Sequence, residues 1–114
     1  HTTGTTPPPP PPPGEGDSGT VTDINVDIAQ WARWEVEVPA GATNFVVTTT
    51  GGTGDGDLYV QQGSAPTSSS YDCRPFDYGN EETCTIAAPA AGTMHIALYG
   101  YSIASGVTMS WSYE

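Results

Sequence analysis

Positive charge is what this sequence has least of. It contains no lysine and only two arginines against 13 acidic residues, which gives a formal net charge of -11. Nucleic acids bind to basic surfaces, and anionic membranes attract polybasic segments, so the charge argues against both kinds of partner. An acidic surface instead favours solubility and the binding of cations.

Long apolar runs are absent as well. No apolar stretch approaches 18 residues, so we expect no membrane-spanning helix. The sequence also lacks the charged segment and short apolar core of a signal peptide. A fragment of a longer protein would have left its signal upstream, so a cytoplasmic location does not follow.

Cysteine is scarce, because Cys73 and Cys84 are the only two. They are 11 positions apart, and Gly79 and Asn80 between them are typical turn residues. Without a companion pair of histidines, two cysteines make a poor zinc site. We therefore predict a disulfide between Cys73 and Cys84, which would indicate an oxidising compartment and contribute about 3 kcal/mol of stability.

The 114 residues suffice for one domain with a modest core. An unbroken proline run at positions 7–13 favours polyproline II, with a span of roughly 20 Å. We predict that residues 1–18 form a proline-rich interdomain linker and that residues 19–114 fold. The alternative, a proline ligand for another domain, does not suit a secreted protein. A linker implies a second unit, here a covalently linked catalytic domain.

Beyond residue 19, apolar and polar residues alternate in short segments, as is typical of half-buried strands. The clearest is WARWEVEV, residues 31–38. The alternation of inward and outward positions places Trp34 in the core, and it does the same for Trp111 near the end of the chain. Segment 44–50 is β-branched enough to be buried on both faces. The expected strands cover residues 20–28, 31–38, 44–50, 57–62, 83–88, 92–101 and 107–113. No useful helix is expected, so the prediction is an all-β, antiparallel β-sandwich in which each sheet has one wet face.

Four motifs then occur in order: GTGDGDLYV, YDCRP, GNEETC and GTMHIALYGYS, at residues 52–60, 71–75, 79–84 and 92–102. Together they resemble the bacterial pre-peptidase C-terminal domain, which is related in fold to the collagen-binding domains of collagenases. The resemblance covers residues 19–113. It implies a jelly-roll-like β-sandwich that is not catalytic and lies at the C-terminal end of a secreted bacterial peptidase.

The resemblance also implies a role in attachment to substrate. We predict an extracellular, monomeric accessory domain that binds an insoluble protein such as collagen. One alternative is a secretion or maturation element that is removed from the mature enzyme. Another is a module that binds a polysaccharide such as chitin. The parent enzyme and the polymer are not identified by the sequence.

Asp55 and Asp57 lie in a glycine-rich run and allow two interpretations. Calcium prefers six to eight oxygen ligands, which carboxylates and loop carbonyls supply, so the two residues could bind Ca²⁺. Alternatively, Asp55 forms an Asx-turn and Asp57 pairs with Arg74. Further acids that could converge on the site are Asp17, Asp23, Asp27, Asp72, Asp77, Glu81 and Glu82.

Catalysis is not expected. Paired carboxylates can hydrolyse glycosides, but the pattern indicates no cleft to hold a sugar. His95 is the only histidine inside the domain, and no nucleophile elbow precedes a helix.

Four aromatic residues alternate with the core residues of their strands and should therefore point away from the core: Trp31, Tyr59, Tyr99 and Tyr101. Tyrosine offers a large contact area with a hydroxyl group, which suits binding to a peptide, a triple helix or a sugar. We predict these four as the substrate-binding residues, with Tyr99 and Tyr101 as the main pair. In the alternative, a loop or the linker covers some of them, and Trp31 packs against the N-terminal segment.

Overall fold

The computed structural model describes residues 16–75 and 79–114, and seven strands account for most of them. The strands are β1 (Asp17–Val26), β2 (Trp31–Val38), β3 (Phe45–Thr50), β4 (Gly56–Gln62), β5 (Glu82–Ile86), β6 (Gly92–Gly100) and β7 (Ala104–Tyr113). This part of the chain contains no helix that could cross a membrane. The predicted all-β class is therefore confirmed, whereas the proline run lies outside the described residues.

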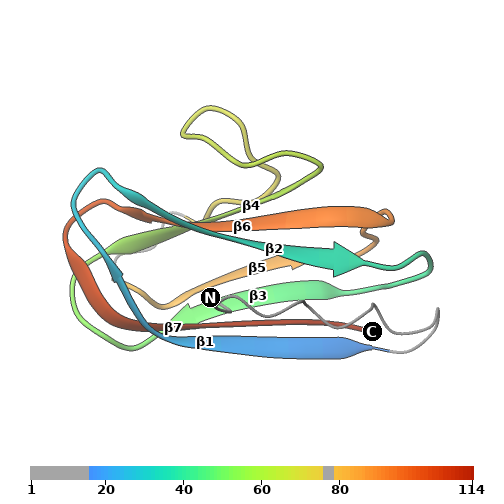
Figure 1. Ribbon diagram of the computed structural model, residues 1–114, viewed down its shortest axis with the longest axis horizontal. Coiled ribbons are helices and arrows are strands. Elements are labelled where there is room, and N and C mark those ends of the chain that lie inside the picture. Colours follow the sequence, from blue (N-terminus) through green and yellow to red (C-terminus); the bar gives the residue numbers. More distant parts are fainter. Residues whose placement is uncertain (1–15, 76–78) are drawn as a thin grey trace, which may run out of the picture.

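Two antiparallel sheets form a sandwich, as Figure 1 shows. The first sheet has the order β1-β7-β3-β5 and the second has the order β2-β6-β4. In the first sheet Asp17 lies opposite Tyr113, so β1 begins two residues before the expected domain boundary at residue 19. In the second sheet Trp31 lies opposite Tyr99.

The inward faces of both sheets supply the core. Its buried side chains are mostly aliphatic, since β-branched and long apolar residues fit a pleated, half-buried surface. They include Ile24, Val26, Val36, Val38, Phe45, Val47, Leu58, Val60, Met94, Ile96, Leu98, Val107 and Met109. Trp34 and Trp111 pack against this core as predicted from parity, but both remain partly exposed because they lie near its margin.

The expectation for segment 44–50 is wrong in one respect. Phe45 and Val47 are buried, but Val46 and Thr48 on the opposite face are only half-buried. β3 lies between β7 and β5, so its backbone is enclosed while its outer face still borders solvent.

β4 also departs from the expected alternation of buried and exposed residues, but it is more buried than expected. Every residue from Gly56 to Gln61 is buried, because the chain after β4 folds back over the outer face of its sheet. We call residues 63–75 the roof loop. Backbone hydrogen bonds between Val60 and Cys73 hold it along β4, and the predicted disulfide between Cys73 and Cys84 is present.

The two ends of the sandwich differ in what they carry. Asp17 and Tyr113 are paired at one end, so both ends of the described chain leave the fold there. Three turns meet at the other end, on the left of Figure 1: residues 27–30, 51–55 and 100–103. We call these three turns the distal end. Backbone hydrogen bonds join its first and third turns, from Ala29 to Gly100 and from Gly100 to Gln30.

Candidate functional site

The glycine-rich turn at residues 51–55 is shaped by close contact with the start of β7 and the residue before it. Gly52 and Gly54 both have positive φ, 70° and 86°. A Cβ on Gly54 would collide with the carbonyl oxygen of Ile103, and one on Gly52 with that of Ser105. Only glycine combines this backbone conformation with such close approach, so the glycines serve the turn itself.

Asn80 holds the same turn from the opposite side. Its side chain is buried, accepts a hydrogen bond from Gly56 N at 2.7 Å, and donates to the carbonyl oxygens of Gly51 and Thr53 at 2.9 and 3.1 Å. Glu81 adds a further bond from Gly51 N at 2.9 Å. From the sequence Asn80 is expected only in a turn, because its partners lie about 25 residues earlier in the chain.

The turn and the start of β4 place Asp55 and Asp57 close to a third carboxylate. One oxygen each of Asp55, Asp57 and Glu82 lies within 4.8 Å of the others. Of the further acids considered, Glu82 is the one that joins the cluster within the described residues, whereas Asp77 lies outside them. We call Asp55, Asp57 and Glu82 the carboxylate cluster.

Each of the three carboxylates also has contacts within the fold. Glu82 is buried and accepts a hydrogen bond from Leu58 N. Asp57 lies 3.7 Å from the guanidinium of Arg74, which is the pairing that the sequence suggested as the alternative to calcium. Oδ1 of Asp55 is buried without a hydrogen-bond donor, while its backbone oxygen accepts bonds from Tyr101 N and Ser102 N.

The pKa of Asp57 is raised from 3.8 to about 6, first by burial and then by the nearby charge of Asp55, while Arg74 partly offsets both. Two carboxylates at close range repel each other when both are ionised. A bound cation, or protonation of one of them, removes this repulsion. The cluster can therefore hold either a proton or a metal ion. Its three carboxylates supply only part of the six to eight oxygens that calcium prefers.

Three of the four predicted aromatic residues come together on the outer face of the β2-β6-β4 sheet. The ring of Trp31 lies 4.8 Å from that of Tyr59 and 4.8 Å from that of Tyr99, centroid to centroid. Tyr71 in the roof loop meets Tyr59 edge-on at 5.6 Å. The guanidinium of Arg33 lies 4.5 Å from the ring centroid of Trp31, which is a favourable cation–π distance.

The predicted binding residues differ in how far they are exposed to solvent. Tyr59 is only 2% exposed, so its expected place on a free surface is wrong: the roof loop covers it. Trp31 and Tyr99 are half-buried in their contacts with each other. Tyr101 is 65% exposed and lies in the distal end.

Two further exposed residues of the distal end could not be recognised from the sequence. Ile28 and Ile103 are 58% and 61% exposed, on the two turns that are hydrogen-bonded to each other. Ile28 is expected at the end of a strand, but β1 ends at Val26 and Ile28 lies in the turn that follows, whereas Ile103 falls between two expected strands. They share the distal end with Tyr101 because the turns after β1 and β6 are hydrogen-bonded to each other, although the two strands belong to different sheets.

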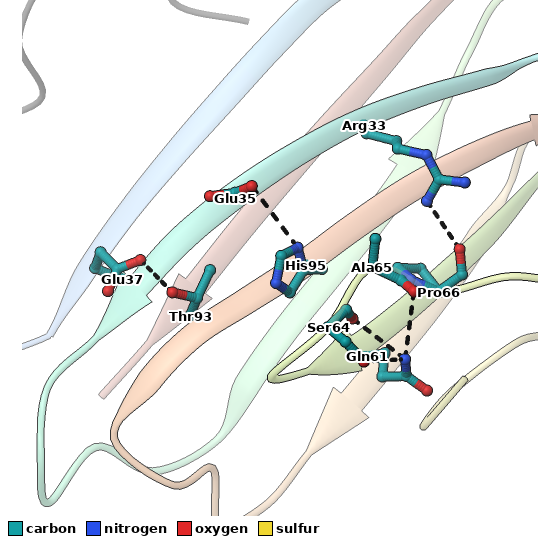
Figure 2. A network of polar contacts seen from close by, with 9 residues as sticks. All are labelled: Arg33, Glu35, Glu37, Gln61, Ser64, Ala65, Pro66, Thr93 and His95. Atoms are coloured by element: carbon teal, nitrogen blue, oxygen red, sulfur yellow. Dashed lines mark hydrogen bonds and ion pairs between the residues drawn. The ribbon is translucent and has the colours of Figure 1, made fainter. Parts of the chain in front are cut away.

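A concave site also occurs on the outer face, contrary to the expectation of no cleft. Its volume is about 470 Å³, and it lies between β2, β6 and the roof loop. Figure 2 shows its polar contacts: Arg33 Nη1 donates to Pro66 O at 2.8 Å, His95 Nδ1 lies 3.9 Å from a Glu35 oxygen, and Thr93 donates to Glu37 at 2.6 Å. We call this site the outer groove.

Comparison with known proteins identifies the fold and its context. Residues 32–100, more than half of the chain, match the bacterial pre-peptidase C-terminal domain. The chain belongs to this family. The resemblance of its four motifs is thereby confirmed.

Relatives of this pre-peptidase C-terminal domain are bacterial proteases. It is 45% identical over 112 residues to the "Neutral protease" of Vibrio proteolyticus, a match that covers 93% of the chain but only 17% of that protein. It is 50% identical over 93 residues to the "Extracellular protease" of Xanthomonas campestris, covering 82% of the chain and 16% of the relative. The domain is thus a small accessory part of such proteins and is not catalytic.

A solved structure agrees with this fold. The protein described as "Solution structure of vEP C-ter 100" is 40% identical to the chain and superimposes with a TM-score of 0.66. The similarity covers 78% of this pre-peptidase C-terminal domain and 87% of the solved chain.

Proposed function

We propose that this domain attaches an extracellular bacterial peptidase to an insoluble protein substrate such as collagen. The observation that carries the proposal is the position of Tyr101, Ile28 and Ile103. These exposed side chains gather at the distal end, opposite the end where the chain enters and leaves the fold.

This position suits a tether. A catalytic domain joined before Asp17 would lie beyond the opposite end of the sandwich, whose longest dimension is 39 Å. The distal end would then face away from the enzyme and toward a surface. Isolated exposed apolar residues are ordinary on proteins, but a group of them at one end is typical of an interaction site.

The neighbouring aromatic residues extend the surface. Tyr99 is one residue before the turn that carries Tyr101, and Trp31 is one residue after the turn that carries Ile28. The half-buried rings of Tyr99 and Trp31 are fixed by their mutual contact, so a binding partner would meet a rigid aromatic platform. Such anchoring would raise the local concentration of scissile bonds for the linked enzyme.

The test is co-sedimentation of the 114-residue protein with insoluble collagen, and in parallel with chitin and cellulose. Tyr101→Ala combined with Ile103→Ser should abolish retention on collagen while leaving the melting temperature nearly unchanged, because both side chains are exposed. Thr22→Ala, an exposed change on β1, serves as the control and should retain binding.

Retention that survives in the folded double variant would remove the distal end from the proposal. Retention on chitin alone would make the module a carbohydrate binder. No retention on any polymer would contradict attachment and favour the secretion or maturation role. That role predicts a lower extracellular yield of the parent protein when the domain is deleted.

A further inference from the structure

The outer groove is lined by acidic side chains that have no cationic partner of full charge within the described residues. Glu35 and Glu37 project from β2 into its wall, as Figure 2 shows, and the Glu35 side chain is 68% exposed. An oxygen of Glu35 lies 3.9 Å from His95 Nδ1, and Glu37 accepts a hydrogen bond from the hydroxyl of Thr93 at 2.6 Å. These neighbours leave most of the negative charge unneutralised.

Few cations are available to neutralise the two glutamates. The chain contains no lysine, and its two arginines are engaged in other contacts. Arg74 pairs with Asp57 and lies over the ring of Tyr59. Arg33 lies over Trp31 and donates to the carbonyl oxygen of Pro66, which holds its guanidinium at one end of the groove.

The shape of the groove favours an extended ligand. Arg33, Glu35 and Glu37 occupy alternate positions of one strand, so their side chains follow one another at about 7 Å along the same face. An extended peptide repeats its side chains at the same interval as the strand and can lie along it.

The roof loop adds a small apolar surface to the groove. Ala65 is exposed there, whereas Pro66 and Ile96, which also line the groove, are buried, and His95 is half-buried. A lysine or arginine side chain has an apolar stem and a charged head, and such side chains pack the stem on apolar surface while the head reaches a charge. Ala65 and the glutamates can receive these two parts.

We infer that the outer groove binds an extended protein segment through its lysine or arginine side chains, with Glu35 and Glu37 as the groups that receive the charge. Arg33 excludes a cation from its own end, so the basic side chains lie toward Glu37. This binding is separate from the attachment proposed for the distal end, because the two surfaces share no residue.

The experiment measures anisotropy of a fluorescein-labelled hexalysine peptide titrated with the 114-residue protein, with labelled hexaglutamate as the reference peptide. Glu35→Gln combined with Glu37→Gln should weaken hexalysine binding about tenfold, as expected for two charge pairs at a partly open site. Hexaglutamate should not bind.

A general attraction to a protein of net charge -11 must be separated from binding in the groove. Asp17→Asn combined with Glu114→Gln removes the same two charges, from -11 to -9, at exposed positions outside the groove. This control variant should bind hexalysine like the wild type. Equal weakening in both double variants, or no hexalysine binding at all, would overturn the inference.

A second measurement localises the ligand. The chain has two histidines, His1 and His95, so their NMR ring signals are readily assigned with a His95→Gln variant. Hexalysine should shift the signals of His95 and leave those of His1 in place. Binding without a shift at His95 would also overturn the inference, even where collagen retention is normal.

Discussion

The guanidinium of Arg74 lies 5.0 Å from the ring centroid of Tyr59. This contact explains why a tyrosine on the outer face of a sheet is buried. Arg74 follows Cys73, whose disulfide to Cys84 fixes the roof loop against β5. From there Arg74 covers Tyr59 and also reaches Asp57 at 3.7 Å, which links the aromatic residues to the carboxylate cluster.

The disulfide should therefore determine both stability and the closure of the roof loop. Replacing both cysteines, Cys73→Ser with Cys84→Ser, should lower the free energy of unfolding by about 2–5 kcal/mol. Urea unfolding with and without reductant measures this loss. Iodide quenching of tryptophan fluorescence should also rise, because Trp31 packs on Tyr59 beneath the loop. A double variant as stable as the oxidised wild type would contradict this account.

Asp57 should make the domain less stable as the pH rises. Its pKa is about 6 in the folded state against 3.8 for an ordinary aspartate, so between these values the native state binds more protons than the unfolded chain. The free energy of unfolding must then fall across the same window, by about 1–3 kcal/mol.

Urea titrations from pH 4 to pH 7 test this dependence. Asp57→Asn should flatten the decline between about pH 4 and pH 6, because the asparagine cannot titrate. The control is Asp23→Asn, an exposed change on β1, which should leave the slope as in the wild type. Identical slopes in the wild type and Asp57→Asn would show that another group governs this window.

Calcium binding to the carboxylate cluster remains a prediction, and it concerns neutral pH. An ion among Asp55, Asp57 and Glu82 would bind the native state alone, so calcium in large excess over its dissociation constant should stabilise the fold by about 2–3 kcal/mol. The melting temperature, measured in calcium and in chelator, should differ by several degrees.

Asp55→Asn should abolish that difference, whereas Asp23→Asn should preserve it. The same melting temperature in calcium and chelator would leave Asp57 with its structural role, the pairing with Arg74. Magnesium serves as a further comparison, because it demands stricter geometry than calcium.

Asn80 should be among the most sensitive positions of the fold. Asn80→Asp keeps the acceptor for Gly56 N but loses both donors to the turn and adds a charge near the carboxylate cluster. The carbonyl oxygen of Thr53 keeps its bond from Ser105 N, but that of Gly51 loses the Asn80 donor and the new charge is buried, so we expect a loss of about 2–4 kcal/mol.

The same change at an exposed position supplies the control. Asn25→Asp also replaces a hydrogen-bonded asparagine, but at a solvent-facing position on β1, and should cost much less. Thermal unfolding compares the two variants. Both changes add a charge and remove donors, so equal losses would contradict the idea that burial makes Asn80 sensitive.

The strands and the core could be predicted from the sequence because both follow from local alternation. WARWEVEV specifies β2 without reference to any other segment, and Val36 and Val38 are buried as its parity requires. The two cysteines could pair only with each other, so the disulfide also followed. The nearness of Asp55 to Asp57 was fixed by their spacing in one turn.

Tertiary structure decided what lies above each face. Parity assigns Tyr59 to the outer side of β4 but does not reveal the roof loop, whose path is set by a bond between Cys73 and Cys84 on different elements. The outer groove likewise requires β2, β6 and the roof loop together. Alternation thus determines the side on which a residue points, because it is a property of one strand. Exposure depends on segments far apart in the chain, and only packing brings those together.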